Sequence, residues 1–445
     1  MNIKLPQEVE FIIGKLKEKG YKAHAVGGCV RDSILGRSPE DWDITTSAKP
    51  EIIKETFNRT IDTGLQHGTV TVLIHKKTFE VTTYRIDGEY LDYRRPTSVE
   101  YTEDLVEDLK RRDFTINAMA YNDEDGLVDA FDGIHDLKNK VIKCVGNPVE
   151  RFNEDALRML RALRFAAQLD FDIEKKTEEA ILMLKKNIES ISAERIQVEL
   201  NKLLISRNPY LFKKLYEVGL LDYIMPEFIP CFHTPQNNPH HQYTVGEHIL
   251  KSVEIIEPNS VLRWTMLFHD IEKPEKRTTD DKGIDHFYGH AEKSSEVAKK
   301  ILRRLKFDNK TINYVTRLIY HHDYRYKVND KSVRKAVYKI GEDIFDWLLK
   351  VQEADVKAQS AYKQKEKLET IQTIKTLYEQ IKKENQCIHL SDLKVSGKDI
   401  INIGVKEGRT IGKTLNYLME IVLEDPNMNE KEKLIMEAKK YIKNN

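Results

Sequence analysis

Two adjacent glycines, Gly27 and Gly28, directly after the apolar run AHAV at residues 23–26 are the strongest local constraint on this chain. The apolar run predicts a β-strand, and the glycines predict a tight turn whose backbone N–H groups can approach a triphosphate closely. A helix that starts near Val30 would point the positive end of its dipole at the same phosphates. Arg31 would add a charge-assisted hydrogen bond. The segment GGCVRD therefore predicts a phosphate-binding turn in an α/β domain.

Two aspartates, Asp41 and Asp43, follow this turn in the sequence DWDITT. Because side chains alternate along a strand, residues two apart project from one face and bring two carboxylates to the same point. Carboxylate oxygens suit Mg²⁺, which leaves its other positions to water and substrate phosphates. Two such ions can activate a 3′-hydroxyl and neutralise a leaving pyrophosphate in an in-line displacement. We therefore predict that Asp41 and Asp43 are catalytic and bind two Mg²⁺ ions.

A third carboxylate is available at Glu80, which stands between the apolar residues Phe79 and Val81 as an inward-facing acid in a strand would. Glu80 is a further candidate catalytic residue, and the alternative is that no protein group supplies a third ligand. An isolated DxD sequence most often marks a turn or a solvated strand end. Its spacing from the glycine motif favours metal binding here.

The overall composition narrows the class of protein. A chain of 445 residues is too long for one hydrophobic core and should form about two to four domains. Lys plus Arg and Asp plus Glu both number 72, so any RNA-binding surface must come from local segregation of charge. Four widely separated cysteines argue against a disulfide framework and a thiolate zinc site. Because no signal-peptide core and no run of roughly 18 apolar residues is present, we expect a cytoplasmic protein without a membrane segment.

The order of sequence patterns predicts an α/β head followed by a helical body. Strand-like runs broken by glycines and polar turns predict a small mixed sheet flanked by helices over residues 1–140. Amphipathic helical patterns follow. We assign residues 141–225 to an all-α neck, 226–345 to a helical domain and 346–445 to a helical tail. The sequence makes no prediction of oligomeric state.

The segment RFNEDALRMLRALRF predicts a helix that begins near Asn153 and places Asp155 and Arg158 on one face. Cytosine and adenine each offer an exocyclic amine beside a ring-nitrogen acceptor, whereas uracil and guanine offer a carbonyl beside a ring N–H. A carboxylate next to a guanidinium could therefore select C and A without a template, at about 1–3 kcal/mol for each bidentate contact. The alternative is a surface ion pair worth under about 1 kcal/mol.

Histidines mark the region that follows. His248, His269–Asp270, His290 and His321–His322–Asp323 all lie in segments with helical patterning. Neutral imidazoles and carboxylates that converge from several helices are suitable ligands for a divalent metal ion. The sequence therefore indicates a candidate second metal site.

Together these motifs resemble those of the polymerase-β-type nucleotidyltransferases, in particular the bacterial class II enzymes that add CCA to tRNA. GGCVRD with DWD resembles the first motif, RRDFTINAMA (111–120) the second, VDAFDGIHDL (128–137) the third and EDALRMLRALRF the nucleotide-selecting motif. The resemblance extends over nearly the whole chain. It implies template-independent addition or repair of the CCA end, with tRNA, CTP and ATP as partners and Mg²⁺ as cofactor.

The resemblance also assigns roles to single arginines. It implies that Arg112 contacts the nucleotide and that Arg161 and Arg164 lie along the nucleotide-binding helix. We interpret Arg111 as part of a solvated charged turn.

Three further segments gain a meaning from the resemblance. RIDGEYLDYRRPTSVEY (85–101) is similar to the flexible loop of relatives that add the terminal A, with a plain exposed hairpin as the alternative. In the fifth motif, ISAERIQVELNKLL, Glu194 and Arg195 are expected to brace the neck. The segment 397–426 is similar to the tail by which such enzymes grip the outer region of tRNA, mainly through backbone and shape.

The histidine region is similar to an HD phosphohydrolase domain, a type attached to some CCA-adding enzymes. The residues that match its H…HD…D pattern, and would bind a second divalent metal, are His248, His269, Asp270 and Asp323. Glu272 replaces the usual small residue after HDI, which leaves the activity of this domain open. The alternative is a structural domain that keeps these residues for packing or hydrogen bonding.

Three alternative functions stay open. A-adding tRNA nucleotidyltransferases and poly(A) polymerases share the head motifs. The HD-type domain could be the working phosphohydrolase with the head as a relic, although intact Arg31, Asp41 and Asp43 argue against this. A protein-uridylylating enzyme also joins such a head to an HD domain, but Asp155 and Arg158 favour tRNA.

Overall fold

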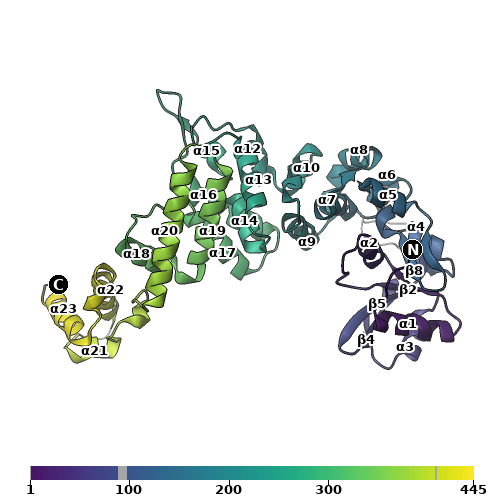
Figure 1. Ribbon diagram of the computed structural model, residues 1–445, viewed down its shortest axis with the longest axis horizontal. Helices are drawn as coiled ribbons and strands as arrows, with labels where there is room; N and C mark the ends of the chain where they lie inside the picture. Colours follow the sequence, from purple (N-terminus) through teal and green to yellow (C-terminus); the bar gives the residue numbers. More distant parts are fainter. Residues whose placement is uncertain (1, 89–97, 406–407, 445) are drawn as a thin grey trace. The chain divides into compact units, whose positions relative to one another are not determined.

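The computed structural model describes residues 2–88, 98–405 and 408–444. The chain divides into two compact units, Met1–Ile229 and Pro230–Asn445 (Figure 1). Each unit has its own set of buried apolar side chains. The division lies close to the predicted start of the third segment at residue 226.

The first unit begins with the mixed sheet, which confirms the predicted α/β head. Its strands lie in the order β3-β4-β5-β2-β1-β8-β9. Their bounds are Ala23–Val26 (β1), Ile44–Thr46 (β2), Thr60–Gly64 (β3), Thr69–Ile74 (β4), Lys77–Thr83 (β5), Met119–Asn122 (β8) and Gly126–Asp129 (β9). Among the described strands of this sheet, β2 and β5 alone run parallel, and the other neighbours are antiparallel.

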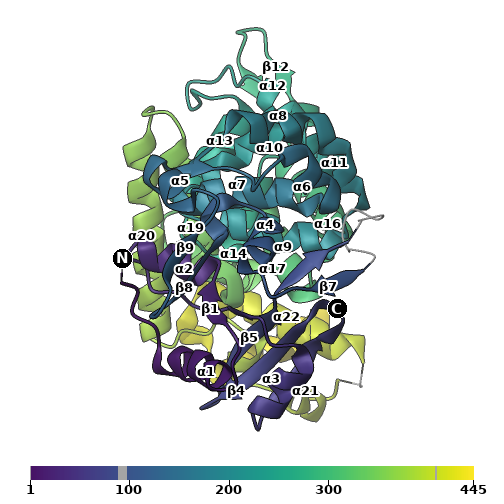
Figure 2. The same cartoon turned by 90° about the vertical axis from the view of Figure 1, so that its right-hand side faces the viewer.

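Helices from the N-terminal part of the chain contact this sheet. α1 (Gln7–Glu18) contacts β1 and β2, and α3 (Pro50–Thr56) contacts β4 and β5. Figures 1 and 2 show α1 and α3 next to each other on the side of β4 and β5. α2 (Gly28–Ile34) follows β1 directly and contacts β1 and β8. The turn from β1 into α2 therefore lies at the interior of the sheet rather than at its edge.

Helices follow the head, with a two-residue parallel ladder between them. The main helices are α6 (Pro148–Glu154), α7 (Leu157–Leu169), α8 (Lys175–Leu184) and α9 (Ala193–Leu204), and the ladder joins β10 (Val141–Ile142) to β11 (Asp172–Ile173). α6 contacts α8, and α7 contacts α9. Most of α7 is buried, including Phe165.

The single helix predicted from Asn153 is wrong, because the chain breaks between α6 and α7. Asp155 has an extended backbone, with φ −142° and ψ 105°. Its carboxylate accepts a hydrogen bond from the backbone N–H of Leu157 at 3.1 Å. Such a bond satisfies one of the free N–H groups at a helix start, so Asp155 ends one helix and caps the next.

The second unit is mainly helical. Its larger part contains α13 (Val245–Ile255), α14 (Ser260–Phe268), α16 (His290–Arg304), α17 (Asn309–His321), α18 (Asp330–Ile340), α19 (Glu342–Ala358) and α20 (Gln364–Lys383). Trp264 of α14 is fully buried, and its ring meets that of Phe307 edge-on at 5.0 Å. α19 runs without a break through the boundary predicted between residues 345 and 346, so that boundary divides one helix.

The C-terminal helices have a small core of their own. α21 (Gly397–Asn402), α22 (Arg409–Glu424) and α23 (Lys431–Asn444) bury residues that include Ile400, Leu418 and Leu434. The predicted tRNA-gripping segment 397–426 covers α21 and α22, and its residues 406–407 lie outside the described residues. Within the described parts of both units, the helices lack the combination of length and apolar composition that crossing a bilayer requires.

Candidate active site

The predicted phosphate-binding turn lies between β1 and α2. Gly27 has a φ of 82°, and a Cβ atom on it would lie 3.1 Å from Nη1 of Arg112. Both the backbone conformation and the close arginine disfavour any larger residue at this position. α2 begins at Gly28, slightly before the predicted start at Val30.

Asp43 and Glu80 lie at the same level of neighbouring strands. In the parallel pair of β2 and β5, Ile44 is opposite Val81, and the two acids directly precede these residues. The backbone N–H of Val26 donates to the carbonyl of Asp43 at 2.9 Å, which extends the pairing of β1 and β2 to Asp43. Because residues at one level of adjacent strands project from the same face, the two carboxylates share a face.

The charge of these acids shows in the pKa of Asp43, which is raised above its ordinary value. Desolvation is the largest cause of this rise in pKa. The positive charge of Arg112 lowers the pKa, whereas the negative charges of Glu80 and Asp41 raise it further. Asp41 and Glu80 are therefore each near enough to Asp43 to repel its charge. A divalent cation with oxygen ligands would relieve this repulsion, so the donor set fits the predicted Mg²⁺ site.

A cleft of about 620 Å³ opens beside Asp41 and Asp43. Its cationic lining residues are Arg31, Arg37, Arg164, Lys202 and Arg207. The sequence analysis missed Arg37, Lys202 and Arg207. Lys202 lies in the fifth motif and Arg207 follows it, both far along the chain from the acids, and Arg37 belongs to no motif. Burial and the nearby charge of Arg207 lower the pKa of Arg37. Acids and crowded cations in one cleft suit a metal-bound triphosphate.

A chain of hydrogen bonds joins α7 to the glycine turn. The guanidinium of Arg161 donates to one oxygen of Asp113 at 2.5 and 2.7 Å. The amide of Asn117 donates to the other oxygen at 3.2 Å, and its carbonyl accepts from Arg31 at 2.6 Å. Burial would raise the pKa of Asp113, but Arg161 and Arg158 lower it below its ordinary value. Arg161 therefore acts on Arg31 through two intermediate side chains.

Phe165 of α7 lies among three arginines. Cζ of Arg164 lies 3.9 Å from the ring centroid, that of Arg31 5.1 Å and that of Arg161 5.4 Å. A guanidinium over an aromatic face is stabilised by about 0.5–1 kcal/mol or more where water is excluded. Phe165 is buried and meets Phe114 edge-on at 5.8 Å. The sequence marked Phe165 only as an apolar helix residue and missed this supporting role.

Arg111 is not the solvated turn residue that the sequence predicted. Its guanidinium donates to the buried carboxylate of Asp108 at 2.7 and 3.0 Å. Its backbone carbonyl accepts from Arg158 at 3.0 Å. α7 thus holds the chain before Arg112 through Arg158 and the chain after it through Asp113, which fixes the predicted nucleotide-binding arginine from both sides.

Asp155 and Arg158 each pair with another residue. The carboxylate of Asp155 accepts from Arg195 of α9 at 2.7 and 3.3 Å. Arg158 donates to Glu154 at 2.5 Å and to the carbonyl of Arg151 at 3.3 Å. The surface ion pair considered between Asp155 and Arg158 is therefore not the arrangement in the fold. Arg195 joins α9 to the junction of α6 and α7, as expected of a residue that braces the neck.

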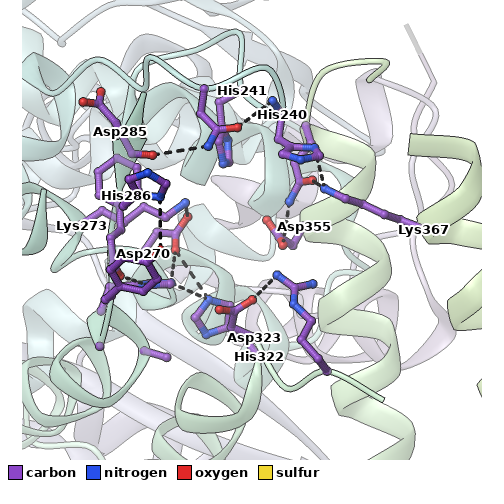
Figure 3. A pocket seen from close by; sticks show the side chains of 18 residues that line it. His240, His241, Asp270, Lys273, Asp285, His286, His322, Asp323, Asp355 and Lys367 are labelled. Atoms are coloured by element: carbon purple, nitrogen blue, oxygen red, sulfur yellow. Dashed lines mark hydrogen bonds and ion pairs between the residues drawn. The ribbon is translucent and has the colours of Figure 1, made fainter. Parts of the chain in front are cut away.

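Candidate metal ligands also gather in the second unit. Two groups of ligand atoms, each within 4.8 Å of one another, are formed by His248, His269, Asp270 and Asp355 and by Asp270, His290 and His322. All of these side chains except that of Asp355 are buried. Figure 3 shows Asp270, His322 and Asp355 in the wall of a cavity of about 340 Å³.

The prediction of Asp323 as a member of this cluster is wrong. Its side chain is 47% exposed and pairs with Arg325 (Figure 3). Asp355 takes the place instead, with Oδ1 2.9 Å from Nε2 of His248 and 3.7 Å from Nε2 of His269. Asp355 lies in a Lys/Glu-rich stretch of sequence where an acid looks solvated, and only the packing of α19 against α13 turns it inward.

The charges of this cluster shift several pKa values. Burial would lower the pKa of His269, but Asp270 and Asp355 raise it to about 10. Burial would raise the pKa of both carboxyls, but their histidine neighbours hold it well below the usual range. Positive charge beside these carboxylates comes from protonated histidines and, for Asp270, from Lys273, whose Nζ lies 2.7 Å from Oδ2; a metal ion could take the place of the protons. Glu272 is not among the described residues that line the cavity.

Similarity to known proteins decides the family. The chain is 37% identical to the CCA-adding enzyme of Ligilactobacillus salivarius, over 97% of this chain and 95% of that protein. The chain belongs to the CCA-adding enzymes. It is also 34% identical to the CCA-adding enzyme of Leuconostoc mesenteroides, over 98% of each chain. The predicted nucleotidyltransferase class is thereby confirmed.

The fold and the order of segments agree with this family. The solved CCA-adding enzyme of Bacillus stearothermophilus, in complex with CTP, matches with a TM-score of 0.74 and 27% identity, over 99% of both chains. Residues 23–143 match the Poly A polymerase head domain, and residues 170–232 match a family described as a probable RNA and SrmB-binding site of polymerase A. Residues 276–438 match tRNA nucleotidyltransferase domain 2, putative.

Proposed function

We propose that the chain adds or repairs the 3′-terminal CCA of tRNA, using CTP and ATP and releasing pyrophosphate. The observation that carries this proposal is the placement of Asp43 and Glu80 at one level of neighbouring strands, with Asp41 close enough to act on the pKa of Asp43, and with Asp41 and Asp43 in the lining of a cationic cleft. The full-length relatives named CCA-adding enzymes and the relative solved with CTP support the choice of reaction and nucleotide.

In this proposal the acids bind the metal ions and Arg31 binds the phosphates. Asp41 and Asp43 would hold two Mg²⁺ ions, with Glu80 as a third acid beside them. When bound, the ions supply positive charge that stabilises the attacking 3′-oxygen and the leaving pyrophosphate. Arg31, oriented by Asn117, would donate to the phosphates. The 3′-hydroxyl loses its proton to solvent as its oxygen bonds to the α-phosphorus, the bond from that phosphorus to the bridging oxygen breaks, and pyrophosphate leaves.

Base choice is assigned to Asp155 and Arg158, with Arg112 in contact with the nucleotide. Each of these two base-selecting side chains is held in its direction by a neighbour. Arg195 binds Asp155, and Glu154 binds Arg158. Side chains held in this way lose little freedom when a base arrives, which favours discrimination between C or A and U or G.

Arg161 and Arg164 have an indirect role in this proposal, because each of their guanidinium groups pairs with a buried carboxylate. Arg161 binds Asp113, and Nε of Arg164 lies 2.7 Å from Oε2 of Glu199. They would support the nucleotide-binding helix and turn, while Arg164 also lines the cleft.

The segment proposed to assist addition of the terminal A begins and ends in a short hairpin. β6 (Arg85–Asp87) pairs antiparallel with β7 (Val99–Tyr101), and residues 89–97 of the predicted loop lie outside the described residues. The tRNA-gripping role of the tail is likewise part of the proposal. An A-adding enzyme or a poly(A) polymerase is the runner-up, because both share the head motifs.

The products of the reaction test the proposal. We would incubate the purified chain with tRNA that ends before the CCA, with CTP and ATP singly and together. We expect two C residues with CTP alone and CCA with both nucleotides. If the chain added only A, and only to a tRNA that already ends in CC, it would be an A-adding enzyme rather than a CCA-adding one. A long A tract would indicate a poly(A) polymerase.

The metal assignment needs a separate variant. Asp43→Ala should abolish transfer of either nucleotide while the fold is kept. Asp62→Ala is a matched control, because Asp62 is a surface acid of β3 paired with Lys54 at 2.9 Å. A near-normal rate for Asp43→Ala would remove the two-metal assignment.

A second activity is supported by the histidine and aspartate cluster of the second unit. We propose that this cluster binds a divalent metal and hydrolyses phosphate esters, as HD-type domains do. The test is phosphate release from nucleotides and 2′,3′-cyclic phosphates by the full chain and by a His269→Ala/Asp270→Ala variant. Unchanged release in the variant would remove this second function.

A further inference from the structure

Arg334 of α18 is a buried arginine that binds the end of another helix. Its side chain lies in a residue that is only 4% exposed. Nε donates to the backbone carbonyl of Leu423 at 3.1 Å, and Nη2 donates to that of Glu424 at 3.3 Å. These are the last two residues of α22, where carbonyls lack partners within the helix and the helix dipole is negative. Arg334 therefore caps α22 from outside.

A third oxygen completes the surroundings of this guanidinium. Nη1 of Arg334 donates to Oε1 of Gln386 at 2.9 Å, in the segment that follows α20. Burial lowers the pKa of Arg334, and the negative charges of Asp330, Asp425 and Glu424 oppose this. Arginine stays charged in proteins, so opening these contacts would leave a positive charge buried without acceptors. The contacts between Arg334 and the end of α22, which we call the joint, are therefore expected to stay closed.

Other side chains of α18 contact α22 beside the joint. Lys331 and Lys335 pair with Glu424, and the hydroxyl of Tyr338 donates to the side chain of Asn416 at 3.2 Å. The spacings of three and four residues put these side chains and the buried arginine on one side of the helix. The two lysine pairs are exposed, and such pairs contribute little to stability. The buried arginine is therefore the main polar contact of this face.

α18 connects the C-terminal helices to the larger part of the second unit. It contacts α19 and α20 as well as α22 (Figure 1). Its buried residues include Val333 and Val337, whereas Tyr338 packs against the core of the C-terminal helices. Arg317 of α17 donates to the carbonyl of Ile340, the last residue of α18, at 2.8 Å. α18 is thus fixed at its own end and holds α22 through the joint.

We propose that Arg334 is a positioning residue for the selection of full-length tRNA, because it fixes the direction of α21–α23 relative to α13–α20. This inference rests on the proposed function, in which the tail grips the outer region of tRNA while the head acts on its 3′ end. Two sites that bind one molecule raise each other's effective concentration, by an amount that depends on the length and stiffness of their connection. A stiff joint therefore favours a tRNA that reaches both sites over a shorter acceptor.

Kinetics with two acceptors test the joint on the full chain. One acceptor is tRNA that ends before the CCA, and the other is an acceptor-stem hairpin without the outer region. For Arg334→Ala we expect KM for tRNA to rise by about 10-fold, a small part of the roughly 100- to 10,000-fold gain that two-site binding can supply. KM for the hairpin and kcat for both acceptors should be unchanged.

Arg263→Ala is the matched control. Arg263 of α14 is 5% exposed and donates from Nε to the backbone carbonyl of Glu257 at 3.2 Å, so it too is a buried arginine that binds a carbonyl. Both residues of this contact lie at α14 and the segment before it, within the larger part of the unit. We expect this variant to keep the KM of the unaltered chain for both acceptors.

A distance measurement reports on the joint without catalysis. Spin labels would be attached at Lys299→Cys in α16 and Met436→Cys in α23, two exposed positions. The four native cysteines are buried, which favours labelling at the new ones. Double electron–electron resonance should give one narrow distance distribution in the otherwise unaltered chain and a broad one after Arg334→Ala. A distribution that stays narrow in this variant would overturn the proposal.

The kinetic outcomes separate the joint from the function on which it rests. A preference of the unaltered chain for tRNA that persists in Arg334→Ala would overturn the role of Arg334 alone. Equal KM of the unaltered chain for tRNA and hairpin would remove the grip of the tail, and with it selection through the joint. An equal rise in KM for both acceptors would mean that Arg334 only supports the fold.

Discussion

The guanidinium of Arg195 donates two hydrogen bonds to the carboxylate of Asp155, from Nη2 at 2.7 Å and from Nη1 at 3.3 Å. Asp155 also caps α7 through the backbone N–H of Leu157. The proposed base-selecting acid is therefore fixed by a side chain of α9 and by its own place at a helix start. Charge-assisted bonds of this kind are among the stronger ones in proteins and give a carboxylate a defined direction.

Arg195→Ala should relax base choice, because Asp155 would lose the partner that orients it. We expect misincorporation of U and G relative to C and A to rise by about 5- to 150-fold, which corresponds to the loss of about 1–3 kcal/mol of discrimination. The measurement is the ratio of incorporation rates for the four nucleotides. Lys185→Ala is the control, since Lys185 forms a neck ion pair with Asp222 at 3.4 Å away from the selectors. Equal base choice in both variants would mean that Arg195 is only structural.

The raised pKa of Asp43 predicts an acid limit on activity that depends on metal concentration. Metal ions bind the ionised carboxylate, and a raised pKa means that protons compete from a higher pH than at an ordinary aspartate. The acid limb of C addition should therefore move to lower pH as Mg²⁺ is increased. Glu80→Gln removes one of the charges that raise this pKa, so the pKa of Asp43 in the metal-free protein should fall, as followed by nuclear magnetic resonance titration. An acid limb that does not respond to Mg²⁺ would contradict the assignment.

Asp113→Asn should destabilise the head and neck in a pH-dependent way. A carboxyl whose pKa is lower in the folded than in the unfolded chain stabilises the fold above its unfolded pKa, and this contribution is lost as the pH falls toward the folded value. Because Arg161 and Arg158 lower the pKa of Asp113, the variant should be less stable by roughly 1.5–3 kcal/mol at pH 7. When unfolding is measured from pH 7 downward, the difference in free energy of unfolding between the variant and the unaltered chain should disappear below about pH 4. Asp62→Asn is the control, and its free energy of unfolding should stay close to that of the unaltered chain at every pH.

Glu199→Ala should be more costly, because it leaves Arg164 buried without its partner. Both side chains are less than a tenth exposed, and Nε of Arg164 lies 2.7 Å from Oε2 of Glu199. Removal of one partner from a buried ion pair costs about 3–5 kcal/mol. Urea unfolding of the first unit, followed by circular dichroism, gives the loss in free energy of unfolding. Glu194, which the sequence predicted to brace the neck, is exposed on the same helix, so Glu194→Ala is the control. Equal stability of the two variants would contradict the prediction.

Several features followed from local sequence because their causes are local. The strand AHAV, the turn at Gly27 and the helix from Gly28 depend on neighbouring residues and on the conformational freedom of glycine. The predicted alternation of Asp41 and Asp43 is a property of extended chain. The apolar neighbours of Glu80 predicted the strand β5 that carries it, but on this strand Glu80 is exposed rather than inward-facing. These patterns fixed the α/β head and the class of reaction.

The errors arose where a residue's partner is distant in sequence. Asp155 was placed inside a helix because the apolar periodicity continues through it, whereas a capping bond to Leu157 and two bonds from Arg195 end one helix there and start another. Arg111 looked solvated because its neighbours are charged, but Asp108 is buried beneath it. Asp323 matched the last position of the H…HD…D pattern in the sequence. In the structure, Asp355 is the aspartate that lies with His248, His269 and Asp270.

The sequence by itself predicted candidate metal-binding acids, a candidate phosphate-binding turn and a tRNA-directed nucleotidyltransferase, because these predictions depend on short-range backbone geometry and on the chemistry of neighbouring residues. Only the tertiary structure decided that Arg161 reaches Arg31 through Asp113 and Asn117, and that Asp270 faces two pairs of histidines. These arrangements depend on helices that meet after long stretches of chain. The distances and directions between their side chains are set by packing, which no local pattern records.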